Sequence, residues 1–278
     1  MRIDTHYPRH PLLQKLVAYY YFLEAEPGFS IQFHVYPQLH IPVTIHRFAS
    51  FRRQNNIGVI SYDPANRYLT LCNGFLKGPL EARIEGQQKM VTIVFQPLGI
   101  NHFINQPYHQ LIGNDIGQFT GWDGPGYHPF LDQLFTEQEQ DTQILLLEDF
   151  LLNRYLAVPD NALMEQAVKM LADVEADVSV SAVAALLSIN ERALNRLFHK
   201  HFSISPVQFR KIARFRHTLR LKMESQKDSL TGVAYQTNFY DQSHLIANYK
   251  ELTGITPSRF FKEIETAADH HIVMRVLE

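Results

Sequence analysis

Two short runs of side chains could hydrogen-bond with the edges of nucleic-acid bases. Arginine can contact guanine through two nitrogens, and asparagine can contact adenine in the same bidentate manner. The first run is spaced so that one helix would carry it on one face; it comprises Arg192, Asn195, Arg196 and His199. The second run opens another predicted helix and comprises Gln242, Ser243 and His244. Both runs need a framework that turns them outward.

Side chains able to catalyse a reaction or hold a metal lack the necessary spacing. Cys72, the single cysteine, lies in a strand-like run and is predicted to be a buried apolar residue. The N-terminal half contains no His-X-His pair, although metal sites need clustered ligands; its histidines include His34, His40, His46, His102, His109 and His128. No glycine-rich phosphate loop or Gly-X-Ser-X-Gly motif occurs. We therefore expect no catalytic residue, no metal and no cofactor.

The residues around the two runs form one sequence pattern that occurs twice. Six pairs of equivalent residues lie 51 positions apart, namely Asn190 and Asp241, Leu194 and Leu245, Phe198 and Tyr249, Ser205 and Thr256, Pro206 and Pro257, and Phe209 and Phe260. Six matches at a single offset indicate a duplicated supersecondary unit rather than coincidence.

Each copy has the pattern of a helix, a tight turn and a second helix. In the first copy, Ser179 can cap a helix with an apolar stripe, and Asn190 can cap the next helix after a short turn. In the second copy, an apolar stripe over residues 230–234 precedes a cap at Asp241. Each copy is therefore predicted to be a helix-turn-helix unit, with the candidate base contacts on its second helix.

Each unit is followed by a hydroxyl residue and a proline, at Ser205-Pro206 and at Thr256-Pro257. This pair of residues is typical of the start of a further helix. The first of these starts a predicted long connecting helix rich in basic residues, Arg210, Lys211, Arg214, Arg216, Arg220 and Lys222. Residues 178–262 hold 13 Lys and Arg against 5 Asp and Glu, whereas the rest of the chain holds 13 against 23. This clustering favours phosphate contact over a merely solvated helix face.

Residues 178–263 resemble the AraC/XylS-type DNA-binding domain of bacterial transcription regulators. The matching stretches are Val178-Ser-Val-Ser-Ala-Val-Ala184, Asn190-Glu-Arg-Ala-Leu-Asn-Arg-Leu-Phe198, Phe239-Tyr-Asp-Gln-Ser-His-Leu245 and Tyr249-Lys-Glu-Leu-Thr-Gly-Ile-Thr-Pro257. The resemblance implies two recognition helices, about 34 Å or one DNA turn apart. It also implies base reading by Arg192, Asn195 and Arg196 in the first unit, and by Gln242, Ser243 and His244 in the second.

Some positions depart from the family pattern. Ser188 and Ser203 stand where the family often has glycine, and we expect Ser203 to take a left-handed conformation at a small cost. Ile246 and Ala247 occupy places where many members carry a polar or basic residue. The sequence therefore predicts that the first unit supplies most of the base-specific binding energy.

The N-terminal half is rich in short strand-like runs separated by turn residues. These runs span residues 31–36, 57–62, 68–72, 80–84 and 90–95. Such a series predicts a β-barrel or a two-sheet jelly roll. Two helices are expected to follow, over residues 128–135 and 141–155. The second has an apolar stripe wide enough to pack against the barrel; the family resemblance suggests dimerisation as its alternative role.

The order of these segments resembles the cupin-like sensor half of many AraC-type regulators, which implies a small effector inside the barrel. Aromatic residues here either line a ligand cavity or fill the core; they include Tyr19, Tyr20, Tyr21, Phe22, Phe33, Tyr36, Phe95, Phe103, Tyr108 and Trp122. Core filling is the favoured alternative because side chains normally fill small barrels.

The chain is predicted to be α+β with two domains. Residues 1–157 would form the cupin-like sensor and dimerisation domain, residues 158–265 the double helix-turn-helix domain, and residues 266–278 a tail. Pro159 and a cap at Asp160 or Asn161 favour this boundary. The tail is expected to fray after Ile264 or to dock as a short element through residues 272–277.

These observations predict a sequence-specific, DNA-binding transcription regulator under the control of a small effector. Double-stranded promoter or operator DNA is the expected partner; RNA polymerase, the effector and a second copy of the chain are further candidates. The alternative is a small-molecule-binding barrel acting through protein contacts, with a weak or vestigial DNA module; an enzyme fused to a DNA-binding domain ranks third. The longest apolar run is far shorter than the ~20 residues that span a bilayer, so we expect a cytoplasmic protein without a membrane partner.

Overall fold

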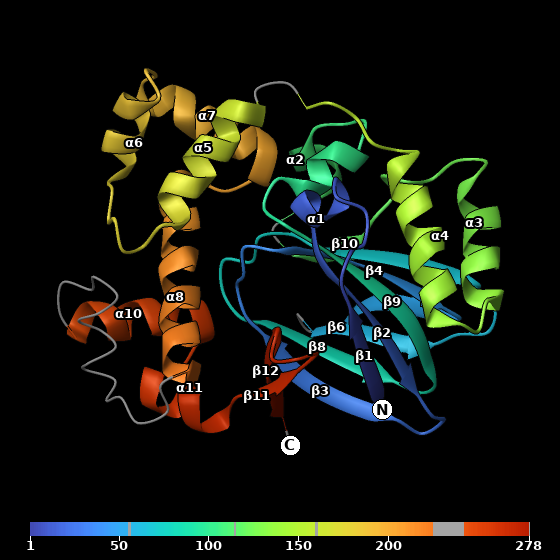
Figure 1. Cartoon of the computed structure of the whole chain (residues 1–278). Helices are drawn as coiled ribbons and strands as arrows, with labels where there is room; N and C mark the ends of the chain where they lie inside the picture. Colours follow the sequence, from blue (N-terminus) through green and yellow to red (C-terminus); the bar gives the residue numbers. More distant parts are fainter. Residues whose placement is uncertain (55–56, 114, 159–160, 225–241, 278) are drawn as a thin grey trace.

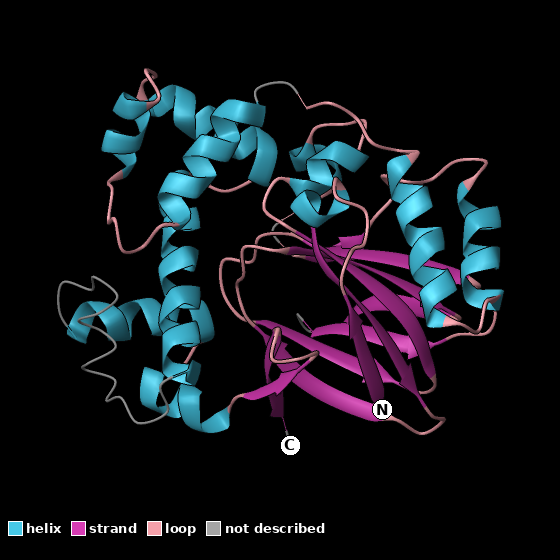
Figure 2. Ribbon diagram, viewed as in Figure 1, coloured by secondary structure: helices cyan, strands magenta, loops and turns pink. Residues whose placement is uncertain are grey.

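The protein consists of a strand-rich body and a helical body. The computed structural model describes residues 1–54, 57–113, 115–158, 161–224 and 242–277. In Figure 1 the helical body stands beside the strand-rich body along one side, and Figure 2 shows the strands gathered in one body with several helices packed beside them. This confirms the predicted α+β class with two domains.

The strand-rich body contains two six-stranded sheets. The first has the order β1 (Arg2–His6), β2 (Val17–Ala25), β9 (Gln88–Phe95), β4 (Ile41–Arg47), β7 (Tyr68–Asn73) and β10 (Ile116–Gln118). The second has the order β11 (Glu265–Ala267), β12 (Ile272–Leu277), β3 (Ser30–Val35), β8 (Leu80–Glu85), β6 (Ile57–Tyr62) and β5 (Ala49–Gln54). Neighbouring strands are antiparallel except β6 and β8. Within the described residues, the two-sheet alternative therefore describes the body better than a closed barrel.

All five predicted strand runs are strands, but β1, β2, β4, β5 and β10 were not predicted. Strand β2 lies between β1 and β9, and Val17, Tyr19 and Tyr20 are almost completely buried along it. A strand buried on both faces loses the alternation of apolar and polar residues that marks a half-exposed strand. The aromatic residues of this segment are evident in the sequence, but the pattern that would predict a strand is missing.

Five short elements accompany the sheets: α1 (Leu13–Leu16), the 3₁₀ helix η1 (Gly99–Phe103), α2 (Tyr108–Leu111), α3 (Tyr127–Thr136) and α4 (Gln140–Leu152). Helices α3 and α4 confirm the two predicted helices. Ile144, Leu147 and Leu151 of α4 are buried in the core. The buried carboxylate of Glu148 accepts hydrogen bonds from the backbone amides of Arg9 and His10 at 2.6 and 3.0 Å. Core packing is thus the role that α4 has within one chain, and dimerisation remains a prediction.

The helical body contains α5 (Asn161–Ala172), α6 (Val180–Leu186), α7 (Glu191–Phe202), α8 (Pro206–Glu224), α10 (Gln242–Thr253) and α11 (Pro257–Glu263). Three predicted caps are confirmed, because Ser179 Oγ accepts a hydrogen bond from Ala182 N at 3.1 Å, Asn190 Oδ1 accepts one from Ala193 N at 2.8 Å, and Ser205 Oγ accepts one from Gln208 N at 3.2 Å. Thr256 occupies the N-cap of α11, but its hydroxyl makes no capping bond. The stripe at 230–234 and the cap at Asp241 lie outside the described residues.

The C-terminal segment returns to the strand-rich body. Strands β11 and β12 form a hairpin, and β12 pairs with β3 so that Met274 lies opposite Val35. The expectation of a docked element is therefore right, and fraying is wrong for the paired residues. Ile272 and Met274 are apolar, which suits an added strand on this sheet. The strands of the strand-rich body thus come from both before and after the helical body in the sequence. The domain boundary at residue 157 remains a prediction.

The two bodies share an apolar junction. Phe75 packs on Phe202 with ring centroids 5.1 Å apart, and Tyr36 packs on Phe260 at 4.9 Å. The Arg216 guanidinium donates to the Tyr36 and Pro37 carbonyls at 3.1 and 2.7 Å. Because α7, α8 and α11 all contribute side chains, the junction fixes both ends of the helical body against the sheets.

Candidate nucleic-acid interface and an apolar cavity

Helix α7 separates an apolar face from a polar one. Leu194 and Phe198 are fully buried, whereas Arg192, Arg196 and His199 are exposed. The buried residues recur at an interval of four, so they fix the rotation of the helix about its axis. The predicted base contacts of the first unit therefore share an exposed face.

Asn195 differs from its neighbours on α7. It is half-buried, and its Nδ2 donates to the Glu191 carbonyl at 2.9 Å. This bond to the helix backbone occupies one amide donor. The second Nδ2 hydrogen and Oδ1 are the groups with which asparagine contacts adenine, so this bond does not by itself prevent base reading.

Helix α10 presents a less polar face than α7. Gln242 is its first residue, Ser243 and His244 are exposed, and Ala247 is exposed one turn further on. Ile246 is half-buried. The predicted contacts of the second unit therefore cluster at the N-terminal end of the helix, followed by residues that cannot bond a base.

Sequence reasoning passed over one basic residue at the end of each recognition helix. Lys200 and Lys250 are exposed in the last turns of α7 and α10. Basic residues at a helix C-terminus complement the helix dipole, and ammonium groups also suit phosphate. Their position in the last turn of each predicted helix could have identified them from the sequence. Both are candidate backbone contacts.

Two turns of the first unit use left-handed serines. Ser188 has φ 57° after α6, and Ser203 has φ 59° at the end of α7. The expectation for Ser203 is confirmed. A non-glycine residue in this region is strained because its Cβ approaches the backbone.

The basic cluster on α8 makes contacts within the protein. Arg210 and Arg214 both pair with Asp177, and Lys211 bonds to the Glu251 carboxylate at 2.7 Å. Arg216 lies at the domain junction, and its burial lowers the pKa of the guanidinium to about 10. These four residues are engaged within the protein, and phosphate contact by the basic cluster remains a prediction. Arg220 is exposed and pairs with Glu224 of the same helix.

Helix α8 separates the two recognition helices. In Figure 1, α7 lies towards its upper end and α10 towards its lower end. A helix of 19 residues is about 28 Å long at 1.5 Å per residue. This length is of the same order as one DNA turn, and the spacing of the recognition helices remains a prediction.

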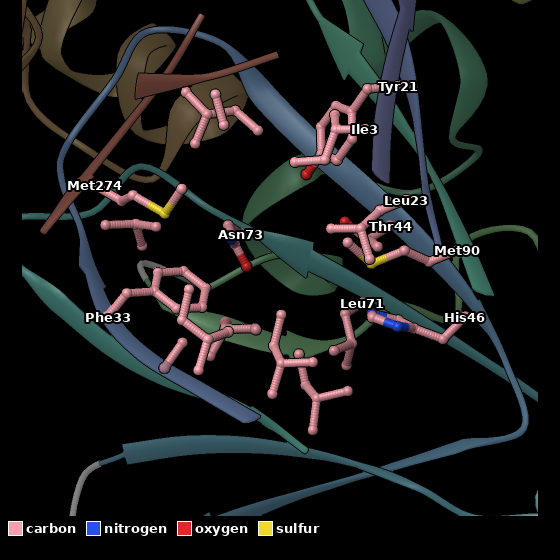
Figure 3. Close-up of a pocket in the computed structure, with 18 of the residues that line it drawn as sticks. Ile3, Tyr21, Leu23, Phe33, Thr44, His46, Leu71, Asn73, Met90 and Met274 are labelled. Atoms are coloured by element: carbon pink, nitrogen blue, oxygen red, sulfur yellow. The ribbon is translucent and has the colours of Figure 1, made fainter. Parts of the chain in front are cut away.

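A cavity of about 120 Å³ lies between the two sheets (Figure 3). Of the ten aromatic residues singled out in the sequence, Tyr21 and Phe33 line it. Tyr20, Phe95 and Trp122 belong instead to the buried core. Most of the aromatic side chains therefore fill the core and two face the cavity, whereas ligand binding there remains a prediction.

Other reactive groups are buried or dispersed. Cys72 is buried as predicted, and burial raises the pKa of its thiol. Across the part of the chain that the structure describes, no three His, Cys, Asp or Glu side chains are grouped to hold a metal. In the same residues, no helix is both long and apolar enough to cross a membrane.

Comparison with known proteins assigns each half separately. Residues 183–263 match a family described as a helix-turn-helix domain, and residues 5–117 match a domain of unknown function (DUF6597). No curated protein matches the chain.

Three solved structures resemble the chain at low identity. ToxT from Vibrio cholerae has a TM-score of 0.47 at 10% identity, covering 94% of this chain and 98% of that one. ToxT with a bound unsaturated fatty acid has a TM-score of 0.44 at 11%, covering 94% and 96%. The AraC-like transcriptional activator CuxR has a TM-score of 0.26 at 14%, covering 80% and 87%. These scores lie below the level at which a shared fold can be argued.

The fold and the exposed helix faces define a two-domain α+β protein with a helix-turn-helix DNA-binding module. The family match over residues 183–263 confirms the predicted helix-turn-helix domain in the C-terminal part of the chain.

Proposed function

We propose that this protein is a sequence-specific transcription regulator that reads DNA mainly through α7. The observation that carries the proposal is the exposed face of α7, where Arg192 and Arg196 stand opposite the buried Leu194 and Phe198. Two arginines on one face can contact guanines or phosphates. Gln242, Ser243 and His244 would add weaker or water-mediated contacts from α10, and Asn195 and His199 would complete the α7 surface.

A small effector bound in the N-terminal domain would control this activity. The inter-sheet cavity supports this part of the proposal, since ligand sites are concave and mostly apolar with a few polar groups. The same cavity also suits the alternative function, a ligand-binding protein with a weak DNA module that acts through protein contacts. Retention of the two arginines favours the regulator.

A mobility-shift assay with the DNA upstream of its own gene, across a salt series, tests the proposal. Specific retention that weakens steeply with salt is expected, because bound cations displace counterions from DNA. Arg196→Ala should reduce this binding, whereas Arg52→Ala provides a matched control at an exposed arginine of the sheet domain. Failure to bind any promoter fragment, with a correctly folded chain, would favour the alternative function.

A further inference from the structure

Residues from three parts of the fold line the cavity between the sheets. Leu23 and Met90 come from the first sheet, Phe33 comes from the second, and the C-terminal hairpin adds a third group; that group is Ala267, Ile272 and Met274. In Figure 3, Met274 enters from the side opposite Met90 and His46. The hairpin that follows the DNA-binding domain is therefore part of a cavity in the other domain.

The lining is apolar and contains no formally charged side chain among the described residues. A carboxylate or ammonium group placed there would lose its hydration without gaining an opposite charge, which costs far more than burying a neutral group. The lining thus selects against ions. The cavity has a volume of about 120 Å³, close to the roughly 150 Å³ of an engineered cavity that binds benzene. A ligand that fits without enlarging the cavity is therefore about the size of one aromatic ring.

One polar side chain in this lining is unsatisfied. His46 is 1% exposed, and neither ring nitrogen has a hydrogen-bond partner of good geometry within the described chain, although Gln88 lies close enough to oppose part of its pKa shift. Burial lowers the pKa of His46 to about 4, so the ring is neutral at pH 7. A neutral imidazole can donate one hydrogen bond and accept another. Buried polar groups are nearly always paired, and a ligand hydroxyl would supply the partner.

The turn of the hairpin is strained and is held against the first sheet. Ala268, Asp269 and His270 all have positive φ, at 50°, 52° and 68°. Such backbone persists only where its surroundings hold it, and it often marks switch regions. Here His271 stacks on Tyr19 with ring centroids 4.3 Å apart. The hairpin is thus held by the sheet domain as well as by its own turn, where His271 N donates to the Ala268 carbonyl at 3.0 Å.

The hairpin is also joined directly to the helical body. Helix α11 ends at Glu263 and β11 begins at Glu265, so a single residue separates them. The carboxylate of Glu263 additionally lies 3.4 Å from the Arg275 guanidinium of β12. A displacement of the hairpin is therefore passed to α11 and, through Phe260, to its contact with Tyr249 of α10.

We propose that the inter-sheet cavity binds a compact, uncharged, mainly apolar molecule that carries one hydroxyl, and that the C-terminal hairpin couples its occupancy to the second helix-turn-helix unit. The coupling rests on the proposed DNA-binding function; the ligand site does not. His46 supplies the polar contact, and Met274 is the part of the hairpin that the ligand touches.

Ligand binding is tested on the full chain, without DNA, by calorimetry with benzyl alcohol, benzoate and toluene. Benzyl alcohol should bind, and benzoate should bind at least about tenfold more weakly because its charge is unpaired. His46→Phe should remove the preference for benzyl alcohol over toluene. Met274→Trp should fill the cavity and abolish binding of both, whereas Arg275→Gln, on the next residue of β12, should retain binding. Equal binding of benzoate would overturn the ligand class. Unchanged binding to Met274→Trp, or no binding of benzyl alcohol to the wild-type chain, would overturn the site.

Coupling is tested by inserting Gly-Gly-Ser between Ile264 and Glu265. The insertion leaves every cavity residue in place, so benzyl alcohol should bind as in the wild type. In the wild type, benzyl alcohol should change the affinity for operator DNA, and the insertion should abolish that change. An undiminished response in the inserted chain would overturn the coupling. If no DNA binds at all, the proposed function fails while the calorimetric result still decides the ligand site.

Discussion

The two helix-turn-helix units share a scaffold but differ in what they expose. Leu194 and Leu245 occupy equivalent buried positions, as do Phe198 and Tyr249. The exposed Arg196 of α7 corresponds to Ala247 of α10, 51 residues later. Packing therefore constrains the inner face of a duplicated helix, whereas its outer face can lose or change its chemistry without disturbing the fold.

The largest expected effect concerns the shared inner face. Phe198→Ala should lower the free energy of unfolding by about 3–5 kcal/mol, because it removes a fully buried ring and leaves a cavity. Tyr249→Phe should cost nothing, since the buried Tyr249 hydroxyl has no hydrogen-bond partner in the described residues. Urea denaturation measures both. A strongly destabilised Tyr249→Phe would show that the two positions are not equivalent in packing.

The next effect separates the outer faces. Arg196→Ala should weaken specific DNA binding by about 1–3 kcal/mol, and Gln242→Ala should weaken it less. Mobility shifts on one operator at fixed salt measure the ranking. If Gln242→Ala weakens specific DNA binding more than Arg196→Ala, α10 and not α7 supplies most of the base-specific binding energy.

Capping gives a smaller difference. Asn190→Ala should destabilise the protein by about 1 kcal/mol because it removes the capping bond to Ala193 N. Thr256→Ala should have almost no effect on stability, since the Thr256 hydroxyl caps nothing. Thermal unfolding of the two variants tests this. Equal losses would contradict the difference between the caps.

The smallest effect lies where each recognition helix ends. Ser203 and Gly254 are 51 residues apart and both have positive φ, at 59° and 77°. Ser203→Gly should stabilise the protein by roughly 0.5–1 kcal/mol by relieving strain, and Gly254→Ala should destabilise it by a similar amount. Chemical denaturation resolves shifts of this size. A destabilised Ser203→Gly would mean that the serine side chain makes a contact worth more than the strain.

Local pattern predicted the helical body better than the sheets. The caps at Ser179 and Asn190 and the left-handed Ser203 depend on neighbours a few residues away, so the sequence displays them. Strand β2 is buried on both faces, and the pairing of β12 with β3 joins residues more than 200 positions apart, which no local pattern records. The ion pairs of Arg210 and Arg214 could not be predicted for the same reason, because their partner Asp177 becomes a neighbour only in the folded chain.

The pairing of β12 with β3 also has a consequence for the order of folding. During synthesis, β3 emerges long before β12, and the whole helical body is made in between. Until then β3 has one unpaired edge, which is a template for association with other chains. A fragment of residues 1–157 would keep that edge open, so we expect it to aggregate or to recruit a strand in trans. A synthetic peptide of residues 264–277 should suppress that association.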